Sequence, residues 1–110
     1  MKLSEIANKL EFKVLTNNEF EDREVSGGYT GDLLSWVMGR AECDNIWITI
    51  MTNINIVAVA TLTDVACILL SEGVTPEEDV IKKANEQGIV IMSSGMSSYE
   101  LSAKISELIK

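Results

Sequence analysis

Short polar residues and glycines gather at four points where a predicted strand ends. These points are Ser26-Gly27-Gly28, Thr52-Asn53, Ser71-Glu72-Gly73 and Ser93-Ser94-Gly95. Ligands bind beyond the carboxyl ends of parallel strands, so the four points predict a polar site of hydroxyls, amides and backbone N–H groups. The predicted ligand contacts are Thr52, Asn53, Asn55, Ser71, Gly73, Ser93 and Ser94. Turns and helix caps favour the same residue types, which explains each residue without a ligand.

Side chains that could catalyse a reaction are scarce. Histidine, the commonest general base, does not occur, and no serine has a lysine beside it. The loops at the strand ends contain no Lys or Arg, and neither GxxxxGK[ST] nor GxGxxG occurs, which argues against a nucleotide triphosphatase. We therefore expect no catalytic role and no cofactor.

Three carboxylates offer an alternative. Asp32, Asp64 and Glu72 could converge on a divalent cation in a metal-dependent hydrolase. Asp32 and Asp64 are better explained as caps of the neighbouring helices. No metal site is therefore predicted, and the hydrolase is the least favoured alternative.

The charge balance restricts the class of partner. The chain has 17 acidic and 9 basic residues, which gives a formal net charge of −8. A field of this sign repels nucleic acid and anionic lipid, so neither is expected to bind. The expected partners are neutral or cationic.

The two cysteines match no CxxC motif and no zinc-ligand spacing. Cys67 lies in an apolar run and is predicted to be a core residue. The acidic neighbours of Cys43 disfavour its thiolate. Residues 1–10 are not expected to form a leader peptide, and with this cysteine usage a reducing, cytoplasmic location is expected.

The segment from Asn45 to Thr63 contains no charged residue and has about the length of a membrane-spanning helix. Asparagines and threonines interrupt it, and its longest purely apolar run is Ile56 to Ala60. β-Branched runs broken by polar pairs are typical of buried strands, so no membrane span is predicted.

Apolar spacing and turn signals predict alternating helices and strands. Helices are expected at 3–10, 32–40, 54–62, 75–87 and 97–109, and strands at 12–15, 24–26, 46–51, 65–70 and 89–92. This order indicates a single α/β domain over residues 1–110. The sheet is expected to be mostly parallel, with about four to five strands and helices on both faces.

Capping residues predict where several helices begin and end. Asp32 is the expected N-cap of the second helix, and Thr75-Pro76 the expected start of the fourth. Gly88 is expected just after the end of the fourth helix. Ser97 and Glu100 form a capping box at the start of the last.

The third predicted helix, residues 54–62, has no charged face. The rest of the domain or a second subunit must therefore cover it. This favours a homodimer, with the face formed by Val57 to Val59 at the interface.

Motifs along nearly the whole chain resemble the DRTGG domain family. They are LSEIANKLEFKVLT, VSGGYTGDLLSWV, WITIMTNINIVAVA, ACILLSEGVTPEEDVIKKANEQGIVIMSS and Ser98-Tyr99-Glu100 at the start of the last helix. The string DRTGG itself does not occur. Thr52 to Asn55 and Ser71-Glu72-Gly73 stand where relatives carry signature residues, and only Gly73 is retained.

The resemblance implies a non-catalytic regulatory domain. It is similar to the N-terminal domain of HPr kinase and to the DRTGG domain of bacterial CBS-domain pyrophosphatases. Such domains are expected to dimerise and to bind a small ligand such as an adenine nucleotide, or a partner protein. Two alternatives stay open: a purely structural dimerisation or scaffold module without a ligand, and the metal-dependent hydrolase.

Overall fold

The computed structural model describes residues 1–110 and contains one five-stranded sheet. The strands are β1 (Lys13–Val14), β2 (Gly27–Thr30), β3 (Asn45–Thr49), β4 (Cys67–Leu70) and β5 (Ile91–Ser93), and their order is β1-β5-β4-β3-β2. β2 to β5 run parallel, and β1 pairs antiparallel with β5. The predicted mostly parallel α/β sheet is confirmed.

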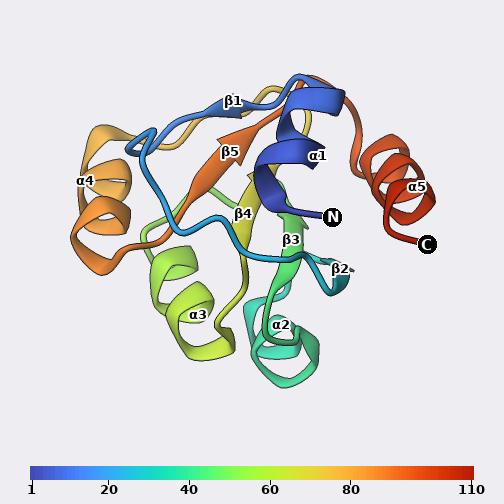
Figure 1. The fold of residues 1–110 in the computed structure, drawn as a ribbon. Helices are drawn as coiled ribbons and strands as arrows, with labels where there is room; N and C mark the ends of the chain where they lie inside the picture. Colours follow the sequence, from blue (N-terminus) through green and yellow to red (C-terminus); the bar gives the residue numbers. More distant parts are fainter.

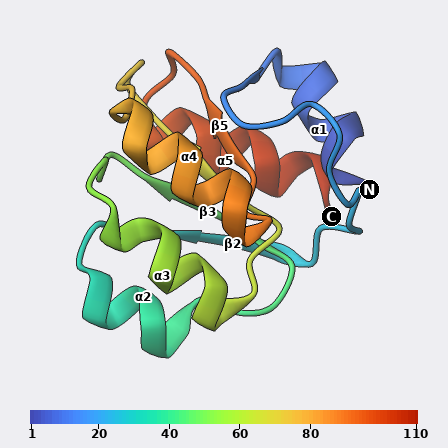
Figure 2. The same ribbon diagram turned by 90° about the vertical axis from the view of Figure 1, so that its left-hand side faces the viewer.

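Five helices pack on the two faces of this sheet. They are α1 (Leu3–Leu10), α2 (Leu34–Arg40), α3 (Asn55–Thr63), α4 (Glu78–Gln87) and α5 (Ser98–Leu108). α1 and α5 lie on one face, and α2, α3 and α4 cover the other (Figures 1 and 2). None of the five is long and apolar enough to span a membrane.

The central strands are buried along their whole length because helices cover both of their faces. Successive side chains of a strand point to opposite faces. Ile46 and Ile48 therefore join the core beneath α1 and α5, whereas Trp47 joins the core beneath α2, α3 and α4. This two-sided burial explains why the strands are continuous apolar runs in the sequence.

Helix α3 contacts α2 on one side and α4 on the other. Val57 and Val59, predicted to form a dimer face, are only 1% and 4% exposed and lie in the core beneath the helix. That prediction is wrong, because the uncharged helix turns these β-branched side chains inward and presents Ala58, Thr61 and Leu62 to solvent. Leu62 is 74% exposed.

Three predicted boundaries differ from the structure. β2 begins at Gly27, where the predicted strand had already ended, because residues 27–30 pair in register with 45–48. α2 has Leu33 rather than Asp32 at its N-cap, and α4 has Glu77 at its N-cap. Pro76 thus precedes the fourth helix instead of occupying its first turn.

Two other predicted helix ends are confirmed. The Ser97 hydroxyl accepts a hydrogen bond of 3.2 Å from the backbone N–H of Glu100 at the start of α5. Gly88 ends α4 with a φ of +71°, a left-handed conformation that glycine adopts at little cost.

Candidate functional site

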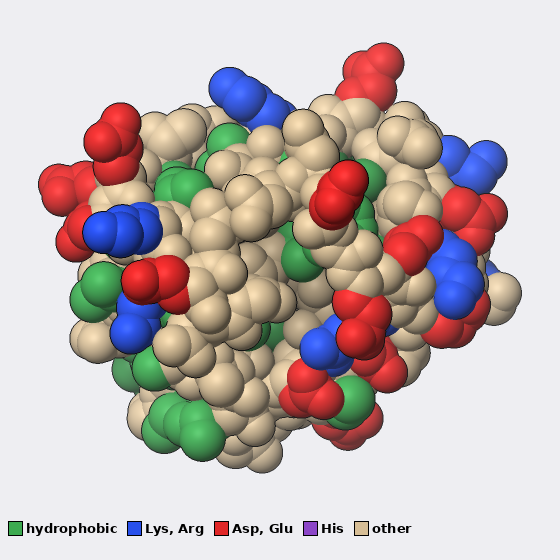
Figure 3. All heavy atoms as spheres, turned by 60° about the vertical axis from the view of Figure 1, so that its left-hand side comes forward, with side chains coloured by type: hydrophobic (Ala, Val, Ile, Leu, Met, Phe, Trp, Pro, Cys, Tyr) green, Lys and Arg blue, Asp and Glu red, His purple; other side chains and the backbone are tan.

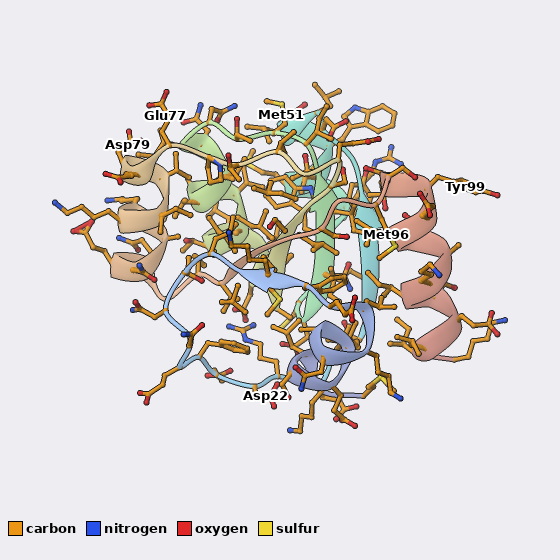
Figure 4. The ribbon with its side chains drawn as sticks, turned by 90° about the horizontal axis from the view of Figure 1, so that it is seen from above. Asp22, Met51, Glu77, Asp79, Met96 and Tyr99 are labelled. Carbon is orange, nitrogen blue, oxygen red and sulfur yellow. The ribbon has the colours of Figure 1, made fainter.

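The four parallel strands all end at one side of the sheet, which we call the carboxyl edge. It comprises the segments that follow the strands: residues 31–33, 50–54, 71–77 and 94–97. Figure 4 shows Met51, Glu77, Asp79 and Tyr99 around this end of the molecule and Asp22 at the opposite end. Sheets of this class bind ligands at the carboxyl edge, so the predicted site residues were sought there.

The segments after β4 and β5 are bonded to each other. The hydroxyls of Ser71 and Ser98 lie 2.7 Å apart, and the N–H of Gly73 donates to the carbonyl of Ser94 at 2.9 Å. The Ser94 hydroxyl accepts from the N–H of Met96 at 3.1 Å. Ser71 is completely buried and Ser93 is 8% exposed. Of the predicted ligand contacts, Ser71, Gly73 and Ser94 therefore hold the two segments together.

The segment after β3 borders an open hollow of about 340 Å³. Its lining residues are Thr52, Asn53 and Ile54 from this segment, and Glu77, Asp79 and Val80 from the start of α4. Of the seven predicted contacts, the structure thus brings only Thr52 and Asn53 to one hollow. Asn55 lines a separate groove between α3 and α4, and its N–H donates to Asn53 Oδ1 at 2.9 Å.

Sequence reasoning did not identify Glu77 and Asp79 as residues of this hollow. The signal was the acidic start of α4 directly after Pro76, where Glu78 was assigned to a capping box and Asp79 to an ion pair with Lys83 that the structure does not contain. Since the side chains of Glu77 and Asp79 are exposed and appear in none of the ion pairs of the structure, they give the hollow an unneutralised negative charge.

Asp32 fixes the position of the segment after β3. Its Oδ1 accepts hydrogen bonds from Thr49 Oγ1 at 2.7 Å and from the N–H of Ile50 at 3.0 Å. Thr49 Oγ1 in turn accepts from the N–H of Met51 at 3.1 Å. The expected N-cap role of Asp32 is wrong, because its carboxylate is directed to β3 instead of to its own helix.

The three carboxylates of the hydrolase alternative do not converge. Asp32 and Glu72 follow strands at the carboxyl edge, whereas Asp64 precedes β4 at the opposite, amino edge. There the carbonyl of Asp64 accepts from the N–H of Asp44, and its carboxylate lies 2.8 Å from Arg23 Nη1. In residues 1–110 no group of three His, Cys, Asp or Glu side chains is placed to hold a metal ion.

Arg23 also sets the electrostatics of the amino edge. Its hydrogen bond holds the pKa of the Asp64 carboxyl below its usual value. Cys43 donates to Asp64 Oδ2 at 3.3 Å, and this bond to a carboxylate raises the pKa of the thiol. Burial raises the pKa of the Cys67 thiol to about 12. Neither thiol is activated as a nucleophile.

Exposed apolar side chains are the other unexpected feature of the carboxyl edge. Leu33, Trp36, Ile50 and Ile54 are 60%, 54%, 46% and 44% exposed, and we call them the carboxyl-edge strip. The bond from Ile50 to Asp32 brings Ile50 beside Leu33, and Ile54 lines the acidic hollow. The edge therefore carries exposed apolar and acidic side chains beside the neutral polar residues that were predicted there.

Comparisons with known proteins address the family. The model of the DRTGG domain matches residues 5–108. No curated protein matches the sequence. A crystal structure of the CBS and DRTGG domains of the regulatory region of Clostridium perfringens pyrophosphatase, complexed with its activator diadenosine tetraphosphate, has a similar fold, with a TM-score of 0.72 at 18% identity. That match covers 94% of this chain and 45% of the other, so the chain spans less than half of that protein. From the match over residues 5–108, the chain belongs to the DRTGG domain family, as its sequence motifs predicted.

Proposed function

We propose that this chain is a non-catalytic regulatory domain that binds a protein partner at the carboxyl edge of its sheet. The observation that carries the proposal is the difference between polar side chains that are bonded within the fold and the side chains that are exposed at the edge. Asp32, Ser71 and Asp64 are engaged in hydrogen bonds or ion pairs that hold the fold together. The exposed side chains of the edge include apolar and acidic residues beside the polar Asn53 and Thr75, a combination typical of surfaces that bind other proteins.

An adenine nucleotide is the second candidate. It is supported by the structural neighbour, a regulatory region complexed with diadenosine tetraphosphate. At the carboxyl edge, however, the loops contain no Lys or Arg. Five carboxylates in these loops and at the start of α4 would repel phosphates: Asp32, Glu72, Glu77, Glu78 and Asp79. The charge of this edge therefore favours a protein over a nucleotide.

Calorimetry with AMP, ADP, ATP and diadenosine tetraphosphate tests the choice between nucleotide and protein. We expect no binding tighter than about 100 μM at the carboxyl edge. A tighter affinity that is lost in Asn53→Ala would make the nucleotide the ligand of this site.

We further propose that the domain forms a homodimer through the outward side of α3. A groove of about 570 Å³ runs between α3 and α4, lined by apolar residues including Ala58 and Leu62, with Lys83 beside them. Figure 3 shows hydrophobic side chains exposed at the lower left of this face, beside a mixed group of acidic and basic side chains. Because α3 contains no charged residue, contact between two copies through this helix brings none of its own like charges together.

Photo-crosslinking in cells tests the partner. A photoreactive amino acid replaces Asn53 at the carboxyl edge or, as the matched control, the exposed Glu42 at the amino edge. The Asn53 position is expected to give an adduct heavier than a covalent dimer, and the Glu42 position none. A covalent dimer alone from Asn53 would favour the scaffold alternative. Identical adducts from both positions would overturn the proposed site.

A further inference from the structure

We propose that the carboxyl edge docks a basic amphipathic segment of the partner protein, an inference that rests on the proposed function. The apolar side chains of the segment would pack on the carboxyl-edge strip. Its Lys or Arg side chains would lie beside Glu77 and Asp79.

Hydrogen bonds hold the backbone of the apolar part of the surface in place. Leu33 and Trp36 are separated by one turn at the start of α2, and the N–H of Trp36 donates to the carbonyl of Leu33 at 3.0 Å. Asp32 fixes Ile50 next to them. A surface that is already ordered loses little conformational entropy on binding, which favours its use as a docking site.

The acidic part begins where the strip ends. Ile54, the last residue of the strip, shares the hollow of about 340 Å³ with Glu77 and Asp79. Arg40, the last residue of α2, stacks its guanidinium 4.2 Å from the ring centroid of Trp36, at the α2 end of the strip, and it forms no ion pair with Glu77 or Asp79. The carboxylates of the hollow are therefore free to pair with cations of a partner.

Charge excludes the other occupants of this surface. Nucleic acid, anionic lipid and nucleotides all bring negative charge to an edge that has five carboxylates in and beside its loops, with Arg40 on Trp36 as the one nearby base. A second copy has a net charge of −8, and Lys82 and Lys83 are its only two basic residues that follow each other in the sequence. A basic segment from a different protein supplies what the surface lacks, apolar cover and positive charge together.

A synthetic amphipathic helical peptide of leucine and lysine is the probe, and a scrambled peptide of the same composition is its control. Labelled peptide is titrated with the full chain, and binding is followed by fluorescence anisotropy. We expect the scrambled peptide to bind about tenfold more weakly or worse, because it cannot present apolar and basic faces side by side.

Two double variants locate the peptide. Glu77→Gln with Asp79→Asn, and Leu33→Ser with Ile50→Ser, should each weaken binding about tenfold. The matched controls are Glu19→Gln with Glu42→Gln, which change the net charge equally at exposed sites elsewhere, and Met38→Ser, which changes an exposed apolar residue outside the strip. The controls should change the affinity by less than about twofold.

Three outcomes would overturn the inference: equal binding of both peptides, control variants that weaken binding as much as the edge variants, or no binding. Sedimentation can show a fourth such outcome. If an edge variant converts a dimer to a monomer, this surface is a contact between two copies of the chain and not a site for a basic segment. If position 53 gives a crosslinked adduct heavier than a dimer but the peptide does not bind, the inference of a basic segment is wrong. The proposed function would then still hold.

Discussion

At the scale of single residues, Asp32 is the side chain on which the geometry of the carboxyl edge depends most. Its Oδ1 accepts from the hydroxyl of Thr49, which is completely buried, and from the N–H of Ile50. Asp32→Ala removes a charged acceptor from both donors. We expect the free energy of unfolding in urea to fall by about 1–3 kcal/mol.

Two further variants separate the effect of the Asp32 hydrogen bonds on stability from a general effect of charge. Asp32→Asn keeps an oxygen at Oδ1, so it should lose less stability than Asp32→Ala. Asp79→Ala removes an exposed carboxylate that takes part in no ion pair, and the free energy of unfolding should change by less than about 0.5 kcal/mol. Equal losses of unfolding free energy in Asp32→Ala and Asp79→Ala would contradict this role of the Asp32 hydrogen bonds.

Residue types predicted the site only in part, for a physical reason. Thr52 and Asn53 were predicted as ligand contacts because they follow a strand, and the structure places both at a hollow. The strip was missed because α2 has apolar residues on two sides: Leu33 and Trp36 face solvent, whereas Val37 faces the core. The spacing of apolar residues alone cannot tell which of two apolar faces is covered.

At the scale of elements, two variants of α3 test which face of the helix is buried. Val59→Lys places a charge in the core beneath the helix and should lower the free energy of unfolding by about 3 kcal/mol or more. Leu62→Lys on the outward side should leave the stability of the monomer within about 0.5 kcal/mol. Urea unfolding of the two variants measures both effects.

Sedimentation completes the comparison of these two variants. Leu62→Lys should reduce any dimer to folded monomer, since it adds a charge to the proposed interface. A folded, stable Val59→Lys protein would show that the inward assignment of Val59 is wrong.

The start of α5 offers a second test at this scale. Ser97 caps the helix through the bond from the Glu100 N–H. Ser97→Ala should lower the free energy of unfolding by about 1 kcal/mol. Ser106→Ala, an exposed change inside the same helix, should be neutral or slightly stabilising because alanine has the higher helix propensity. A loss in Ser106→Ala as large as that in Ser97→Ala would argue against capping.

The sequence predicted the order of all ten elements but not every boundary. Long apolar runs and clear caps, as at Ser97 and Gly88, were enough for the elements themselves. The boundary predictions were wrong where a residue type favours two different interactions. Asp32 is a favourable N-cap by type, yet in the fold its carboxylate binds β3, a partner distant in sequence. Local preference cannot anticipate such a contact.

At the scale of the whole molecule, the topology explains why the fold was easier to predict than the site. Parallel strands joined by helices bring segments near residues 32, 52 and 77 to one edge. The alternation of elements already implied this convergence. Which side chains remain exposed there depends on packing between helices distant in sequence, and this is not encoded in any one segment.

The ion pairs of the amino edge connect distant parts of the chain and make stability depend on pH. Arg23 bridges Asp44 and Asp64, which precede β3 and β4. Because Arg23 lowers the pKa of Asp64, the folded state binds that proton less readily than the unfolded chain does. The stabilisation is therefore fully present above the unfolded pKa, about 3.9, and is lost as the pH falls through the lower folded value.

We expect the stability of the wild type to decline below about pH 4, and this decline to be shallower in Asp64→Asn. The Asp64 carboxylate is 59% exposed, so the difference should be about 1 kcal/mol or less at neutral pH and smaller in high salt. Urea unfolding at a series of pH values measures it. Asp79→Asn is the matched control, because it removes the same charge from a residue without an ion pair. If both variants follow the same pH profile, the bridge from Arg23 does not contribute to acid stability.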